Sequence, residues 1–147
     1  MARCALVDTP TNLALFSDDF SNAVWVPTNA SVGSNVVTAP DGTATGDDII
    51  EDGSVGGHWV ANAGVTVPSV ANDITISVSL RASGRGWAFI QMTELTAVTS
   101  VNVFVNVSTG TLGTIGLGAQ WVGGRATIVA EGSGGWYRVT LTARKNK

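Results

Sequence analysis

The stretch Asp73-Ile74-Thr75-Ile76-Ser77-Val78-Ser79-Leu80-Arg81 decides the fold, because apolar and polar side chains alternate strictly along it. In an extended strand, successive side chains point to opposite faces of the sheet. The apolar residues therefore form one face and the polar residues the other. This alternation predicts a β-strand over 73–81 with one face in a core and the other in water.

Two further stretches have the same pattern. Valine occupies every second position from Val101 to Val107, and Tyr137, Val139 and Leu141 alternate with polar residues. Turn signals rich in Gly, Asp, Ser and Pro separate these stretches at the spacing of a β-sandwich. Three one-sided strands predict sheets packed face to face. We therefore expect an all-β fold, an antiparallel two-sheet sandwich.

The opposite faces of these strands carry aromatic residues. If the valines point inward, Phe104 points outward, and the same parity places Trp136 outward and Tyr137 in the core. In Trp87 to Met92 neither face is clearly polar, which indicates that at least one strand is covered on both sides.

The segment before the first strands begins with Ser17-Asp18-Asp19-Phe20. A serine followed by acids is typical of a helix N-terminus, so we expect a brief helical turn that carries Phe20 and Trp25 inward. It cannot run far, because Pro27 follows.

Composition limits the kinds of partner. At 147 residues the chain suits one domain, and charged residues make up only 13%. Lysine occurs only at positions 145 and 147, so we expect no nucleic-acid binding. No apolar run has the length of a membrane span or of a signal-peptide core, so we expect no membrane partner. One cysteine and one histidine cannot form an internal disulfide or a Cys/His zinc site.

Charge is uneven along the chain. Residues 1–52 hold eight acids against Arg3, a net −7, and residues 53–147 hold three acids against seven bases, a net +4, which together give the overall −3. Opposite charges of this kind either guide one copy onto the next or mix on the surface of the folded sandwich.

The chain also resembles a known family. Residues 11–25, which read TNLALFSDDFSNAVW, resemble the start of a domain common in phage tail and other virion proteins, and later segments agree in order: 39–43, 79–82, Trp87 after a glycine, 108–113 and 135–139. The resemblance implies a jelly-roll sandwich similar to carbohydrate-binding modules, on a virion assembled in the host cytoplasm. It divides the chain into a leader or assembly arm over 1–11, a sandwich domain over 12–143 and a basic tail over 144–147.

Catalytic groups are scarce, so we expect no enzyme. A nucleophile needs a base within hydrogen-bond reach, and the sequence offers only Cys4 with His58. Glycoside hydrolysis needs two carboxylates across a cleft, and acids are few after residue 52. No cofactor motif is present, and no dedicated metal site is expected. One weaker alternative is a calcium site in the acidic stretch with ligands from Asp47, Asp48, Glu51 and Asp52; the other interpretation is solvated turn residues.

The aromatic residues are the best functional candidates: Trp59, Trp87, Phe104, Trp121 and Trp136. They form either a core, an interface with a neighbouring protein or a platform on which sugar rings stack. The first hypothesis is a non-enzymatic virion structural protein, such as a head decoration, short fibre or minor tail subunit. It binds its own copies, by analogy as a trimer, and capsid or tail proteins. The alternative is a glycan-binding module that attaches the particle to a cell surface.

Overall fold

The computed structural model describes residues 12–62, 64–66 and 72–146, and those residues form strands joined by turns. The strands are β1 (Trp25–Thr28), β2 (Ala30–Val37), β3 (Gly46–Glu51), β4 (Trp59–Asn62), β5 (Asp73–Leu80), β6 (Trp87–Glu94), β7 (Thr99–Asn106), β8 (Thr111–Leu117), β9 (Trp121–Glu131) and β10 (Trp136–Lys145). They pair in the orders β1-β4, β2-β3, β5-β10-β9 and β6-β7-β8, always antiparallel.

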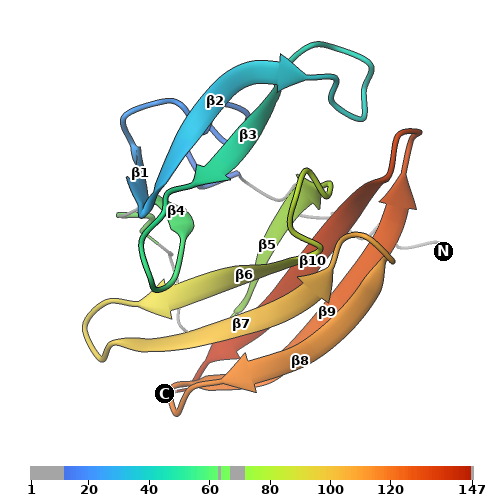
Figure 1. Cartoon of the computed structure of the whole chain (residues 1–147). Coiled ribbons are helices and arrows are strands. Elements are labelled where there is room, and N and C mark those ends of the chain that lie inside the picture. The colour runs from blue at the N-terminus through green and yellow to red at the C-terminus, as the bar shows by residue number, and fades with distance from the viewer. Residues whose placement is uncertain (1–11, 63, 67–71, 147) are drawn as a thin grey trace, which may run out of the picture.

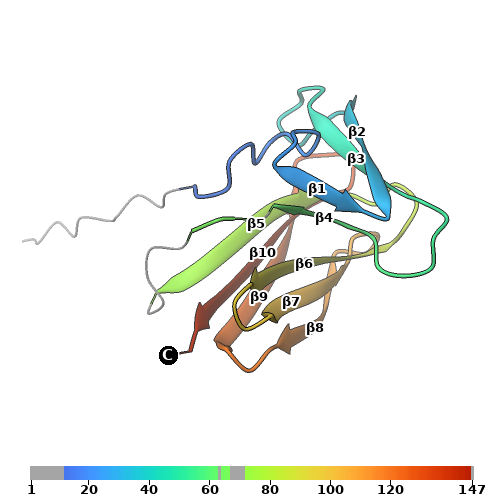
Figure 2. The ribbon, with the colours of Figure 1, turned by 90° about the vertical axis from the view of Figure 1, so that its left-hand side faces the viewer.

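Two three-stranded sheets enclose the core. The sheet β5-β10-β9 packs against β6-β7-β8, and Figure 2 shows the two as separate layers. Alternating residues of β7 and β10 fill the space between them: Val101, Val103, Val105, Val139, Leu141 and Ala143, all 0% exposed. The three alternating stretches of the sequence are β5, β7 and β10. The predicted all-β sandwich is confirmed, and the jelly-roll winding stays a prediction.

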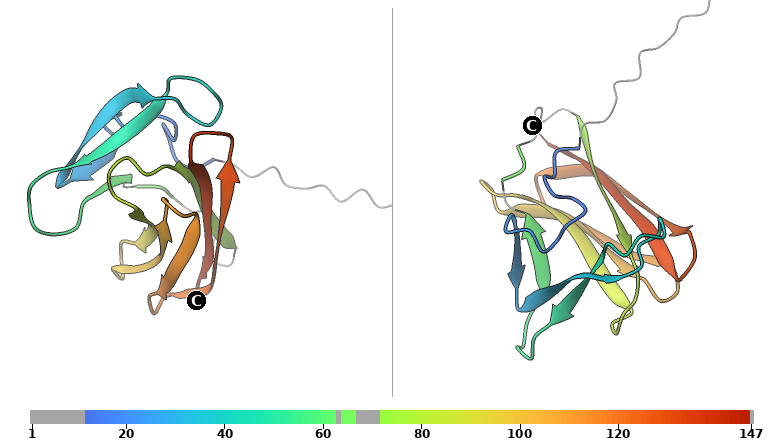
Figure 3. Two further views of the ribbon diagram at one scale, coloured as in Figure 1. Left: turned by 45° about the vertical axis from the view of Figure 1, so that its right-hand side comes forward. Right: turned by 90° about the horizontal axis from the view of Figure 1, so that it is seen from above.

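The two shorter pairs lie outside this sandwich. Figure 1 shows β2 and β3 above it and β1 with β4 to one side, and Figure 3 shows the same arrangement from two other directions. Single polar contacts join β3 to the β5–β6 loop: Arg85 Nη2 lies 2.8 Å from Glu51 Oε2, and the Ser83 hydroxyl lies 3.4 Å from Asp48 Oδ2.

The predicted helical turn at Ser17–Phe20 is wrong. Residues 14–24 form consecutive turns, with the amides of Asp19, Asn22 and Trp25 each bonded three residues back. These three bonds do not form a continuous helical ladder, and Phe16, which precedes the predicted turn, has a left-handed φ of +51°. Phe20 and Trp25 are half-buried against each other, with their ring centres 4.8 Å apart.

Coverage on both sides is found on β10 rather than β6, and only at Trp136 and Thr142, because Arg138 and Arg144 on the same outer face are exposed. On β6, Trp87, Phe89 and Gln91 are exposed, whereas Ile90 faces the core. On β10, Trp136 lies on the face opposite the core yet is only 9% exposed, because the segment after β2 covers it.

The structure tests the predicted division of the chain at its C-terminal end but not at its N-terminal end. The expected arm over 1–11, including Cys4, lies outside the described residues, as does Lys147. Arg144 and Lys145, expected in a separate tail, are instead the last residues of β10, where they pair with Val122 and Trp121 of β9. Among the described residues, no helix is long and apolar enough to span a membrane.

Candidate functional site

An aromatic surface covers the outer side of the β6-β7-β8 sheet. The alternation that sends the β7 valines into the core turns Phe104 outward, and the same alternation on β6 exposes Trp87 and Phe89. The exposed fractions are 57% for Trp87, 44% for Phe104 and 36% for Phe89. Phe89 and Phe104 are direct cross-strand partners whose ring centres are 5.9 Å apart. We call these three side chains the aromatic face.

The Trp87 ring extends toward β8 across the neighbouring strand. A side-chain carbon added at Gly113 of β8 would lie 3.0 Å from Trp87 Cζ3 and 3.1 Å from the Phe104 carbonyl oxygen. Because Gly113 has no side chain, the Trp87 indole can pack directly against the backbone of β8. A larger residue there would displace the ring, so Gly113 belongs to the site although it carries no functional group.

Uncharged polar groups surround the aromatic face. The outward cross-strand pairs along β6 and β7 are Trp87–Asn106, Phe89–Phe104, Gln91–Asn102 and Thr93–Ser100. These pairs include amides and hydroxyls but no charged group. Such a surface suits a neutral partner that offers both apolar area and hydrogen-bonding groups.

Two of the tryptophans predicted for the site are buried instead. Trp121 is 6% exposed and donates its indole N–H to the Thr99 carbonyl oxygen at 3.2 Å. Trp136 donates its indole N–H to the Thr38 carbonyl oxygen at 3.0 Å, and the Arg81 guanidinium lies 5.2 Å from its ring centre. Neither can present a ring face to a ligand or to another protein, so including them in the site was wrong.

Trp59 lies apart from these residues. It begins β4, is 41% exposed and packs against Gly57, where an added side-chain carbon would lie 2.7 Å from the ring. Of the five predicted aromatic residues, the structure brings together Trp87 and Phe104 on one face and leaves Trp59 on a different sheet.

The four acids of the predicted calcium site each interact with a different group of the protein. Asp47 accepts bonds from the backbone amides of Phe20 and Asn35 at 2.7 and 2.8 Å. Glu51 pairs with an arginine, Asp48 faces a serine, and Asp52 accepts from the following turn. Within residues 12–62, 64–66 and 72–146, no three metal-binding side chains come together. These positions are structural turn and capping groups.

Hydrogen bonds lower the pKa values of five carboxyl groups. A general acid at neutral pH needs a raised pKa. The pKa of Glu131 is lowered by the Ser79 hydroxyl and then by Arg138, whose Nη2 lies 2.8 Å from Oε1. Hydrogen bonds likewise lower the pKa values of Asp41, Asp52, Asp73 and Glu94.

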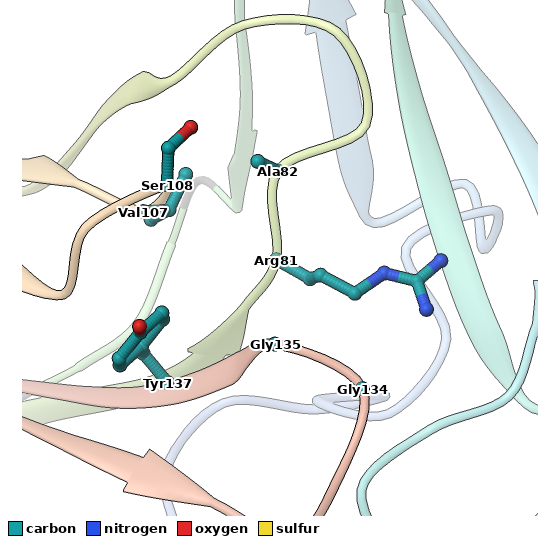
Figure 4. A pocket seen from close by; sticks show the side chains of 7 residues that line it. All are labelled: Arg81, Ala82, Val107, Ser108, Gly134, Gly135 and Tyr137. Atoms are coloured by element: carbon teal, nitrogen blue, oxygen red, sulfur yellow. The ribbon is translucent and has the colours of Figure 1, made fainter.

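An open cleft lies at one end of the sandwich. It holds about 480 Å³ and is lined by Arg81, Ala82, Val107, Ser108, Gly135 and Tyr137, among others. Figure 4 shows Ser108 and Tyr137 along one side and Ala82 and Gly135 along the other, with the Arg81 guanidinium pointing away from Tyr137. The cleft thus offers a small apolar wall with two hydroxyl groups.

Sequence reasoning named Trp87 and Phe104 but left Phe89 out of the site. The parity of β6 placed Phe89 beside Trp87, yet only the register of β6 against β7 puts Phe89 directly opposite Phe104. That register is set by the turn at residues 95–98, which carries no standard two-residue hairpin signal.

No protein-family model matches the chain, and no curated protein is similar to it.

Proposed function

We propose that the chain is a non-enzymatic structural or accessory protein of a bacteriophage virion, such as a head decoration, short fibre or minor tail subunit. It acts through protein–protein contacts with its own copies and with capsid or tail proteins. The setting is supported by the sequence resemblance to virion jelly-roll domains. The mode of action is supported by one observation, the exposed aromatic face on a sheet whose outer pairs carry no charge.

The aromatic face is an apolar patch on a solvent-exposed surface. Apolar patches rimmed by polar residues mark interaction sites in small soluble proteins. Tryptophan and phenylalanine are also the residues that protein interfaces favour at their centres.

The test is the mass of the purified chain by light scattering, with acrylamide quenching of tryptophan in the same samples. The contact predicts that association shields Trp87, so the quenched fraction falls as the mass rises. Trp87→Phe identifies the part of the quenching that comes from Trp87, and Trp59→Phe is the matched control for another exposed indole. Association that leaves Trp87 fully quenchable would contradict contact between copies through this face.

Glycan binding is the second candidate, and the alternation of rings and amides favours it. Trp87 and Phe89 lie beside Asn106, Gln91 and Asn102 on adjacent positions of the sheet. A flat ring suits the apolar face of a pyranose, and amides can bind its hydroxyls. A glycan-array screen with Trp87→Ala and Trp59→Ala tests this role. Binding lost only in Trp87→Ala supports it, and no binding by the native chain counts against it.

A further inference from the structure

The loop between β6 and β7 exposes apolar side chains in a strained conformation. Leu95 is 68% exposed and Val98 is 81% exposed. Val98 has a φ of +50°, a region that costs a side-chain-bearing L-residue roughly 1–2 kcal/mol and that a β-branched residue rarely adopts. Strain of this kind at an exposed position points to a role for the side chain itself. We call residues 95–98 the tip.

The tip is held in shape by one carboxylate. Glu94 accepts a hydrogen bond from the Ala97 amide at 2.5 Å, and its other oxygen lies 3.3 Å from Lys145 Nζ. The base of the loop is thereby fixed to the end of β10. Leu95 and Val98 therefore project from a loop whose base is held in place by these two contacts of Glu94.

The open cleft lies at the other end of the same strands. The tip precedes β7 and Val107 follows it, so eight residues of extended chain, roughly 26 Å, separate the two. β10 agrees, because it begins beside the cleft at Tyr137 and ends beside the tip at Lys145. Figure 1 shows the β6–β7 loop and the β9–β10 turn at opposite sides of the sandwich.

Charge differs between these ends. Beside the tip lie three bases, Arg125, Arg144 and Lys145, against Asp73 and Glu94. At the cleft end, acids outnumber bases. Asp48 and Glu51 contact the β5–β6 loop and Glu131 ends β9, while Asp41 and Asp47 follow Pro40 and Gly46, which lie beside Gly132 and Trp136. The bases are Arg81, Arg85 and Arg138. The tip end therefore carries a net +1 (three minus two) and the cleft end −2 (three minus five), so the two ends attract when copies meet head to tail.

We propose that the tip of one copy docks in the cleft of a second copy. Leu95 and Val98 pack against Ala82 and Tyr137, and the basic tip end faces the acidic β2–β3 side of its neighbour. This contact rests on the proposed assembly function and adds a surface separate from the aromatic face. Because different surfaces meet, the contact is heterologous and leads to a ring or a filament.

The experiment uses two variants that block opposite halves of the contact. Val98→Asp removes the apolar side chain and suits the backbone, because Asp tolerates positive φ. Ser108→Arg fills the cleft with a base that faces the basic tip end of the next copy. Light scattering should show that the native chain gains mass with concentration and loses it with added salt, and that each variant alone gains less mass than the native chain. A 1:1 mixture of the two should gain mass over either variant alone, because one variant keeps the cleft and the other keeps the tip.

Val55→Asp is the matched control, because Val55 is fully exposed in the β3–β4 loop. This variant should associate like the native chain. A monomeric native chain, variants that associate as strongly as the native chain or a mixture that gains no mass over either variant alone would each overturn the docking of tip in cleft. Association that survives both variants but is lost in Trp87→Ala would refute this contact and leave the proposed function standing. Association lost in Val98→Asp and kept in Trp87→Ala would support it and remove the aromatic face from the contact between copies.

Discussion

Replacing Trp136 with phenylalanine tests whether this residue attaches the β2–β3 pair to the sandwich. Trp136 is the buried link from β10 to the Thr38 carbonyl oxygen. Loss of the indole N–H removes one hydrogen bond, which contributes about 1 kcal/mol. The smaller ring also gives up roughly 40 Å² of buried apolar area, worth about 1 kcal/mol. We expect the free energy of unfolding to fall by about 2 kcal/mol in total, and the melting temperature by roughly 6 °C for a domain of this size.

The assay is chemical denaturation combined with hydrogen exchange of backbone amides. Trp136→Phe should speed exchange in β2 and β3 more than in β7, because the contact it breaks joins β10 to the segment after β2. Trp87→Phe is the matched control, since that indole is 57% exposed and its replacement should cost less than about 0.5 kcal/mol. Equal losses in the two variants, or unchanged exchange in β2 and β3, would refute the reasoning.

Three further changes test the turns and the acid response. Gly110→Ala should cost more than Gly42→Ala in denaturant unfolding: both glycines have positive φ, which costs alanine about 1 kcal/mol, but only the carbon added at Gly110 would collide with Tyr137, at 2.3 Å. Val98→Gly relieves roughly 1–2 kcal/mol of backbone strain but costs roughly 0.5–1 kcal/mol in unfolded-state entropy, so the chain should keep or gain stability, and a loss above about 1 kcal/mol would show that the loop is not strained. The folded-state pKa of Glu131 is lowered by the hydroxyl and the guanidinium beside it, so its contribution is complete above about pH 4.5 and disappears as the pH falls through the lowered value. Glu131→Gln should therefore lose less stability than the native chain between neutral and acid pH, and parallel curves would exclude this role.

The sequence predicted those parts of the fold that a single strand can encode. Alternation in β5, β7 and β10 identified the core valines and leucines because each strand has one face in the core. The same rule assigned Trp136 to the correct face of β10, but the expectation that it would be accessible there was wrong. Parity gives the face of a sheet but not what covers that face, and the cover at Trp136 comes from Thr38, far away in the sequence.

The candidate site was predictable in part for the same reason. Trp87 and Phe104 could be assigned outward positions from their own strands. Their assembly with Phe89 and Gly113 depends on the register across β6, β7 and β8, including the shift between Val103 and Val105. No local pattern specifies that shift.

The position of β10 in the middle of its sheet has a consequence for how the chain folds during synthesis. β10 pairs with β9 through a short turn, but its other partner, β5, lies more than 50 residues earlier, with Tyr137 opposite Leu80. Closing so long a segment costs entropy before any contact is gained. While a ribosome is still producing β9, the strands β5 and β9 have no partner between them. The hairpins of β6, β7 and β8 can form early, but their valines gain a complete opposing layer only after β10 has left the exit tunnel.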